Sequence, residues 1–310
     1  MSTINTGIRQ FLLASAVVAA ASMVSGAMAS ASVSTGVIDF RVRPPFRGFR
    51  AALHPSLPPD QSDDALMEAF LVDMDAAGIV LAVAMGRTAP AEGEMRARIP
   101  NADVVSLVAR YPGRFVGFGS VDVRDPRAAL DEIDRCAGQG LRGIAFDNPL
   151  SSPALYDDDA SLLPLYERCA RQRLIISLTA SVMVGPDLSY SMPQHIQRVG
   201  LAFPDTPVVV PHAAWPWTMQ MIAIALQGKM FGRSKVYMIP DFYLSQANAP
   251  GRSDYIDAAN FGLADRILFA SSYPALPLEP SVRAVEAIAF TDPLAARRIL
   301  HDNAAGLFVG

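Results

Sequence analysis

The chain has 310 residues, of which 51% are apolar and 18% charged, and its formal net charge is −4. A chain so rich in apolar residues can bury a sizeable core, which excludes a disordered protein. The weak negative charge offers no general attraction for nucleic acid or for an anionic membrane surface, so we expect no nucleic-acid partner.

The first expected element is a secretory signal peptide at residues 1–29. Residues 1–10 contain one charged side chain, Arg9, and residues 11–24 are uncharged and rich in Ala, Val and Leu. Ala27 and Ala29 then form a small-x-small cleavage pattern. We therefore expect export, to the periplasm, with cleavage after Ala29. The alternatives are an uncleaved membrane anchor and a helix packed on the domain, which itself covers residues 30–310.

Past residue 35, short runs rich in β-branched residues alternate with amphipathic segments. We expect strands at residues 37–43, 79–85, 115–121, 143–146, 174–178, 208–212, 236–239 and 267–270. We expect helices at residues 63–77, 102–110, 126–139, 162–171, 194–202, 217–226, 255–261, 282–290 and 293–301. The first of these helices has Ser62 as its N-cap and ends at Gly78.

Eight strands that alternate with helices predict parallel pairing through right-handed crossovers. Closure into one α/β domain, a (β/α)8 TIM barrel, is the economical solution. An open doubly wound sheet is the alternative, but no Gly-rich nucleotide turn follows an early strand. In a barrel the chemistry lies on the loops that follow the carboxyl ends of the strands, which predicts where the site should be.

The first expected strand carries two arginines, Arg41 and Arg43, which lie on one face because side chains alternate along a strand. If Phe40 and Val42 face the helices, both guanidinium groups point into the mouth of the barrel. We expect at least one of these two arginines to bind an anion.

Arg47, Arg50 and Arg87 lie on adjacent loops, and Arg47 is a further candidate for substrate binding. Several guanidinium groups near one pocket repel one another, so they need carboxylates of the protein or an anionic ligand. The alternatives are a structural ion-pair network with Asp147 or Asp241, or simple solvation.

His212 ends the sixth expected strand, and an imidazole there can act as a general acid or base near neutral pH. Asp241 follows the seventh strand directly, with Tyr243 two residues further on. Either could orient His212, bind a ligand or pair with an arginine. The alternative for His212 is a hydrogen-bonded core residue without a catalytic role.

Ser272 offers a hydroxyl after the last expected strand, but no Gly-x-Ser-x-Gly elbow surrounds it, so we do not expect a serine nucleophile. Trp215 follows His212 closely and could wall an aromatic substrate pocket or pack on a neighbouring loop. The two cysteines, Cys136 and Cys169, are expected as buried thiols, with a disulfide as the alternative. The remaining histidines (His54, His195 and His301) are expected on the surface or on helices.

Six segments form an ordered set of motifs: residues 37–44 (VIDFRVRP), 140–146 (GLRGIAF), 164–169 (PLYERC), 209–214 (VVPHAA), 266–274 (RILFASSYP) and 299–308 (ILHDNAAGLF). In this order and spacing they resemble the amidohydrolase-2 family, the group of aminocarboxymuconate-semialdehyde decarboxylase-like enzymes, from about residue 36 to residue 310. The resemblance implies a TIM barrel and a hydrolase or decarboxylase that acts on a small carboxylated, in some cases aromatic, compound.

The resemblance also implies a metal site whose ligands this chain largely lacks. The family's Asp-x-His-x-His places its two ligand histidines at Arg41 and Arg43, its fifth-strand histidine at Leu178 and its eighth-strand aspartate at Ser272. Only the sixth-strand histidine is present, as His212. A catalytic zinc site needs about three protein ligands, and guanidinium groups repel a dication, so we expect no metal or other cofactor.

These observations predict a metal-independent hydrolase or carbon–carbon lyase for a small anionic substrate. Arg41 and Arg43 would bind the anion, and His212 would transfer the proton with Asp241 as its partner. The alternative is a non-catalytic ligand-binding pseudoenzyme or scaffold of the same fold. A third arrangement would bind a metal elsewhere, through Asp241, His212 and loop groups. The family resemblance makes a homodimer the default expectation.

Overall fold

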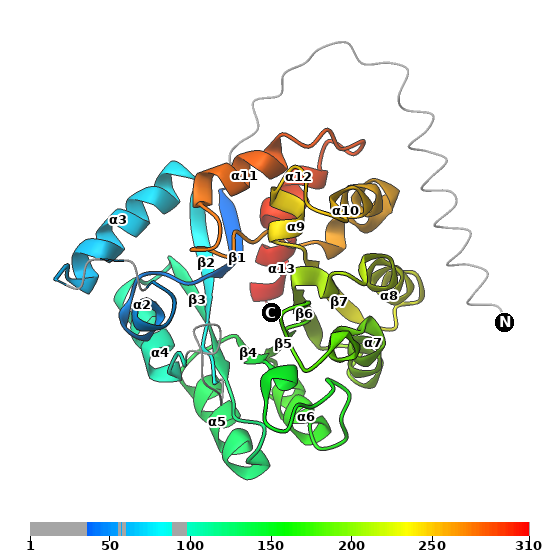
Figure 1. Ribbon diagram of the computed structural model, residues 1–310, viewed down its shortest axis with the longest axis horizontal. Helices are drawn as coiled ribbons and strands as arrows, with labels where there is room; N and C mark the ends of the chain where they lie inside the picture. The colour runs from blue at the N-terminus through cyan, green and yellow to red at the C-terminus, as the bar shows by residue number, and fades with distance from the viewer. Residues whose placement is uncertain (1–35, 55–56, 58–59, 89–97, 310) are drawn as a thin grey trace.

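The computed structural model describes residues 36–54, 57, 60–88 and 98–309; the expected signal peptide lies outside these residues. Seven parallel strands pair in chain order, from β1 to β7. Figure 1 shows that the sheet curls around the centre of the molecule, with helices outside it. This is the predicted TIM barrel. None of the helices within the described residues is long and apolar enough to cross a bilayer.

The strands agree with the predicted ranges to within one residue at each end. They are β1 (Val37–Val42), β2 (Ile79–Met85), β3 (Phe115–Ser120), β4 (Gly143–Phe146), β5 (Ile175–Leu178), β6 (Pro207–Pro211) and β7 (Lys235–Ile239). The outer helices are α3 (Asp63–Ala76), α4 (Asn101–Arg110), α5 (Pro126–Gly138), α6 (Leu163–Arg171), α7 (Pro193–Ala202), α8 (Thr218–Phe231), α10 (Arg252–Ala258) and α11 (Leu278–Glu286). Two short helices, α2 (Arg47–Leu53) and α9 (Phe242–Ser245), were not predicted.

The eighth predicted strand, residues 267–270, is not a regular strand, although it closes the barrel. Leu268 donates its N–H to a carbonyl of β7 (2.9 Å), and the carbonyl of Phe269 accepts an N–H of β1 (2.8 Å). The N–H of Phe269 instead donates to the carbonyl of Ile299 (3.0 Å), in the helical turn before the last helix, and that of Ser271 donates to the Asp39 carboxylate (3.1 Å). Because its N–H groups are divided among these partners, the segment forms single bridges rather than a ladder.

The inside of the barrel is filled by apolar side chains and closed at one end by the last helix, α13 (Asn303–Phe308). The ring of Phe308 stacks on Phe40 with the centroids 5.6 Å apart, and Phe118 meets Phe40 edge-on at 5.8 Å. Arg142, which directly precedes β4, donates to the carbonyl of Phe308 (3.1 Å). The closed end is therefore the amino end of the strands, and the loops at the carboxyl end are left for the site.

Phe40 corrects the predicted alternation along the first strand, because it lies inside the barrel and not against the helices. The pairing of β1 with β2 shifts register between Asp39 and Val42, and the Asp39 carboxylate accepts the N–H of Arg41 (3.0 Å). This irregularity changes which side chains face inward, and Val42 joins the outer core. Arg41 consequently still turns toward the carboxyl ends of the neighbouring strands.

Candidate functional site

Four side chains from separate parts of the chain meet at the carboxyl end of the barrel. His212 follows β6, Asp241 follows β7, Ser272 follows the closing segment, and Arg41 comes from β1. The Asp241 carboxylate is buried and accepts the Ser272 hydroxyl (2.8 Å), Nη1 of Arg41 (3.3 Å) and Nδ1 of His212 (3.0 Å). Nη1 of Arg41 also donates to the Ser272 hydroxyl oxygen (2.8 Å). The structure thus brings together four residues that the sequence suggested one by one.

Asp241 is ionised at neutral pH. Burial raises the pKa of its carboxyl group, but His212, Arg41 and the Ser272 hydroxyl outweigh burial and hold the pKa at about 2. An ionised carboxylate only accepts hydrogen bonds, so Nδ1 of His212 carries the proton that lies toward Asp241. Nε2 of the imidazole is therefore left with a lone pair.

His212 is neutral at the same pH. Burial lowers the pKa of its imidazole, Arg41 and Arg43 lower it further, and Asp241 opposes both effects. The side chain keeps 12% of its surface exposed. A neutral imidazole with a fixed tautomer and a free lone pair is equipped to remove a proton.

Three of these residues hold a backbone conformation that side chains other than glycine rarely adopt. The φ angles are 64° at His212, 31° at Asp241 and 55° at Ser272. Each such residue costs roughly 1–3 kcal/mol and persists where the surroundings determine it, which occurs often at functional sites. Here the hydrogen bonds to the Asp241 carboxylate supply that constraint.

Arg43 differs from Arg41 because its guanidinium group makes no hydrogen bond or ion pair with the residues that the structure describes. Its backbone is held on both sides, with the N–H donating to the carbonyl of Tyr273 (2.9 Å) and the carbonyl 2.7 Å from Nε2 of His54. Burial, Arg41 and Arg87 all lower the pKa of Arg43. His54, expected on the surface or on a helix, directly follows α2 and is buried at 7% exposure.

The ion-pair network given as the alternative to anion binding accounts for two arginines, Arg41 and Arg87. Arg41 pairs with Asp241, and Nε of Arg87 lies 3.3 Å from the Asp147 carboxylate. Both carboxylates are used in this way, and Arg43 is left as the cationic group without a partner in the described part of the chain. A guanidinium group without a counter-charge favours an anion.

Arg47 is not brought to this group. It begins α2, its side chain is half exposed, and Nη1 donates to the Ser106 hydroxyl (2.8 Å) with Asp103 at 3.8 Å. Both partners belong to α4, so the structure gives Arg47 a role in joining two helices.

Trp215 and Tyr243 stack on each other, with ring centroids 4.8 Å apart and planes 14° from parallel. Nε1 of Trp215 donates to the carbonyl of Pro250 (3.0 Å), so the indole packs on a neighbouring loop. Burial raises the pKa of Tyr243 to about 12. The pair lies on the segments that follow His212 and Asp241, which places aromatic surface close to them in the chain.

Sequence analysis assigned no role to Asp39, although it opens the motif that contains both arginines. Its Oδ1 accepts the N–H groups of Arg41 (3.0 Å) and Ser271 (3.1 Å), while Oδ2 has no partner within the described ranges. Burial raises the pKa of this carboxyl group to about 7. Asp39 therefore positions Arg41 and the closing segment. Its position two residues before Arg41 was the sequence signal that could have predicted this role.

Comparison with known proteins identifies relatives of this chain. The model of the family described as amidohydrolase matches residues 38–309. A 2-amino-3-carboxymuconate-6-semialdehyde decarboxylase from Dictyostelium discoideum is 31% identical over 96 residues, 31% of this chain and 25% of that protein. A gamma-resorcylate decarboxylase from Polaromonas is 24% identical over 214 residues, 57% of this chain and 65% of that protein. The chain thus spans less than two thirds of these curated relatives.

Among solved structures, an uncharacterized TIM-barrel protein from Bordetella bronchiseptica superposes with a TM-score of 0.76. It is 33% identical, and the match covers 87% of this chain and 97% of that protein. This likeness extends over nearly all of the barrel and supports the architecture described above.

Proposed function

The chain belongs to the amidohydrolase family, and on that premise we propose that it is a metal-independent hydrolase of a small carboxylated substrate. The observation that carries the proposal is the His212–Asp241 pair, which leaves the lone pair of His212 Nε2 available. The charge of Arg43, which has no counter-ion among the described residues, acts on the same imidazole. Decarboxylases of carboxylated compounds among the relatives support a substrate of that class.

The side chains at the site do not fit the metal that the family resemblance implies. No group of three or more His, Cys, Asp or Glu side chains in the described residues could hold an ion. The Asp241 carboxylate already binds Nη1 of Arg41, and a second guanidinium group follows at Arg43. In our proposal Arg41 supplies the fixed positive charge, and no step requires a metal.

Arg43 is proposed to bind the substrate carboxylate, because a guanidinium group can donate two parallel hydrogen bonds to it. Arg41 is held by Asp241 and Ser272 and adds positive potential beside it. The stacked Trp215 and Tyr243 are proposed as the wall that contacts an aromatic part of the substrate.

In the proposed reaction, Nε2 of His212 removes a proton from water while the water oxygen attacks the substrate carbonyl carbon. The carbonyl electron pair moves to its oxygen, and the cations Arg41 and Arg43 stabilise that charge. Collapse re-forms the carbonyl and breaks the bond to the leaving atom, which takes the proton from the His212 imidazolium. Asp241 holds the imidazole in the required tautomer throughout.

A carbon–carbon lyase is the second candidate, favoured by the decarboxylases among the relatives. Two features of the site oppose it. A guanidinium group stabilises the carboxylate charge that decarboxylation must remove, and His212, with its lowered pKa, is a poor donor of a proton to carbon at neutral pH. These features favour hydrolysis.

The test combines elemental analysis of the purified protein with turnover of a panel of carboxylated esters, lactones and amides, with and without chelator. We expect no stoichiometric metal and hydrolysis that survives chelation but is lost in His212→Ala and Arg43→Ala. His301→Ala, a partly exposed histidine paired with Asp302, is the matched control. Binding without turnover would instead support the pseudoenzyme, and CO2 release the lyase.

We also propose that residues 1–29 direct export and that the mature domain acts as a homodimer. The apolar segment and the small residues before Ser30 support the first part, and the family resemblance supports the second. Light scattering of the mature domain measures the second directly.

A further inference from the structure

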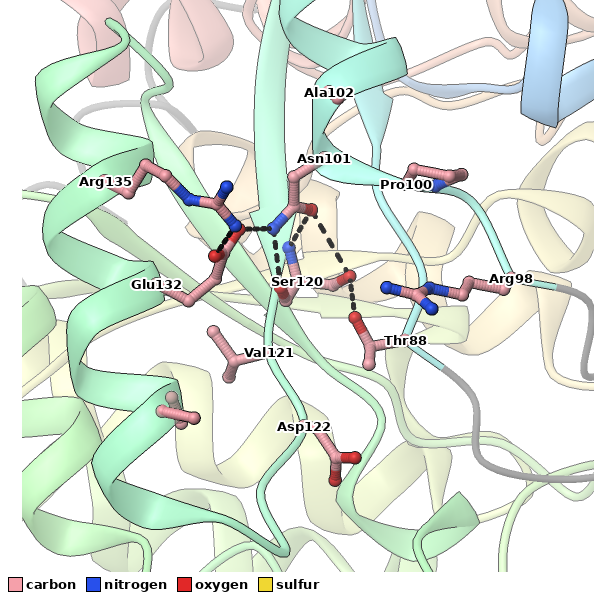
Figure 2. Close-up of a pocket in the computed structure, with 12 residues that line it drawn as sticks. Thr88, Arg98, Pro100, Asn101, Ala102, Ser120, Val121, Asp122, Glu132 and Arg135 are labelled. Atoms are coloured by element: carbon pink, nitrogen blue, oxygen red, sulfur yellow. Dashed lines mark hydrogen bonds and ion pairs between the residues drawn. The ribbon is translucent and has the colours of Figure 1, made fainter.

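A cavity of about 360 Å³ lies between the first turn of α4 and the helix α5, beside the ends of β2 and β3 (Figure 2). None of His212, Asp241, Arg41 and Arg43 lines it. Its volume falls within the range of small-molecule sites. We propose that this cavity is a second ligand site, separate from the proposed catalytic group, and that it binds a small organic monoanion with an apolar body.

The floor of the cavity is held in place by the side-chain amide of Asn101, whose N–H groups and oxygen are all hydrogen-bonded. Nδ2 of Asn101 donates to the carbonyl of Ser120 (2.8 Å) and to Glu132 (2.6 Å), and its Oδ1 accepts the N–H of Ser120 (2.8 Å). The hydroxyl groups of Thr88 and Ser120 lie 2.7 Å apart. A Cβ at Gly86 would lie 2.5 Å from Oδ1 of Asn101, so glycine there leaves room for this amide. Such a floor is preformed and needs little ordering by a ligand.

The charged groups around the cavity leave one excess positive charge. Glu132 pairs with Arg135, and Asp122 forms an ion pair with Arg124. The charge of Arg98 also helps to lower the pKa of Asp122, but Arg98 makes no hydrogen bond or ion pair among the described residues. Figure 2 shows its guanidinium group turned toward the Thr88–Ser120 pair. Because Arg124 already neutralises Asp122, the excess charge at Arg98 matches one negative charge on a ligand.

The other lining side chains are apolar, so they favour a ligand whose body is also apolar. Val121, Ala129 and the exposed Ala128 contribute only hydrocarbon, as do Pro100 and Ala102. A ligand with a carboxylate at Arg98 and an apolar body along α5 would satisfy both surfaces. A multiply charged anion would leave charge against these alanines without a partner.

The cavity is a neighbour of the proposed catalytic group but not part of it. A smaller hollow of about 10 Å³, room for about one water molecule, shares Thr88 and Ser120 with it and reaches Asp147. Asp147 pairs with Arg87, whose charge acts on Arg43. Different residues line the cavity and form the catalytic group. Variants can therefore distinguish a ligand bound at Arg98 from one bound at the catalytic group.

The test is a titration of the full chain with 4-fluorobenzoate, followed by fluorine NMR. Arg98→Ala should weaken binding by about tenfold or more, because it removes hydrogen bonds to a charged group. Ala128→Phe fills the cavity from an exposed helix position and should abolish binding, whereas Ala128→Ser should retain it. Arg110→Ala, an exposed arginine on α4 that pairs with Asp64, is the matched charge control.

Arg43→Ala separates this inference from the proposed function. Binding that persists in Arg43→Ala but is lost in Arg98→Ala and Ala128→Phe supports the second site, even if no substrate is ever turned over. Binding that is unchanged in both cavity variants, or that is lost in Arg43→Ala alone, overturns it.

Discussion

Nδ1 of His212 lies 3.0 Å from one carboxylate oxygen of Asp241 and 3.2 Å from the other. The same carboxylate accepts hydrogen bonds from Ser272 and Arg41, so one side chain orients the imidazole, fixes a hydroxyl group and neutralises a buried cation. Because Asp241 is 2% exposed, water cannot replace it as the acceptor. The consequences of changing it should therefore be large for stability and for chemistry.

Asp241→Asn should lower the free energy of unfolding by about 3–5 kcal/mol, because it leaves the buried Arg41 without its counter-charge. Urea denaturation at neutral pH measures this. Asp265→Asn is the control, since Asp265 is half exposed in its pair with Lys229 and should cost at most about 1 kcal/mol. Equal losses in the two variants would contradict the assignment.

The pH–rate profile should report the depressed pKa of His212. The base form is active, and burial and the arginines lower the pKa of His212 below 6.5, so the acid limb of kcat/KM should have its midpoint below pH 6.5. In Asp241→Asn the midpoint should fall further, because the carboxylate raises that pKa, and the rate should drop roughly 10²–10⁴-fold. A midpoint at or above the ordinary value would count against His212 as the base.

Asp39 should make the protein less stable as the pH rises from about 4 to about 7. In the unfolded chain this carboxyl group loses its proton near pH 3.8, whereas in the folded protein the pKa is about 7, so ionisation favours the unfolded state over that window. Asp39→Asn keeps an oxygen for both N–H groups and should flatten the dependence. Asp157, whose pKa burial also raises to about 7, contributes in parallel, and Asp157→Asn should flatten it separately. A slope unchanged in Asp39→Asn would show that the group is ionised in the folded protein.

His54 should affect substrate binding and not the chemical step. Its Nε2 is hydrogen-bonded to the carbonyl of Arg43. His54→Ala should therefore raise KM roughly tenfold, with kcat nearly unchanged. His54→Gln retains a donor and should recover most of the loss. A fall in kcat at unchanged KM, or failure of the glutamine variant to recover, would argue for a merely structural effect.

The exported protein should begin at Ser30. Cleavage after Ala29 follows from the small-x-small pattern at residues 27–29, and mass spectrometry of the mature protein measures the N-terminus directly. A mass that retains the first 29 residues would favour the anchor.

The fold could be predicted from the sequence because short, mostly apolar runs alternate with amphipathic segments along the chain. Ser62 does accept the N–H of Ala65 at the start of α3, as expected. The predicted strand at residues 267–270 is not regular because the N–H of Phe269 bonds a helical carbonyl and the N–H of Ser271, just after it, bonds the Asp39 side chain. Partners so far away in the chain leave no local pattern.

The site could be predicted in part. Arg41 lies near the end of β1, His212 and Asp241 follow β6 and β7, and Ser272 follows the closing segment. A barrel must bring the carboxyl ends of its strands together. Alternation along β1 predicted the face of Arg41 correctly but that of Phe40 wrongly, because the register shift in β1 cannot be read from spacing. Arg47 was grouped by its position on a loop, yet the unpredicted helix α2 carries it to α4.

The φ angles at His212, Asp241 and Ser272 are positive, which is unfavourable for residues other than glycine. At these three positions, selection for thermostability and selection for ligand chemistry therefore act in opposite directions. Glycine at any of the three would relax the chain, and it would also remove a functional group. A lineage that no longer needed the chemistry should therefore drift toward glycine at these positions first. Continued use of the site should instead keep polar side chains at these positions.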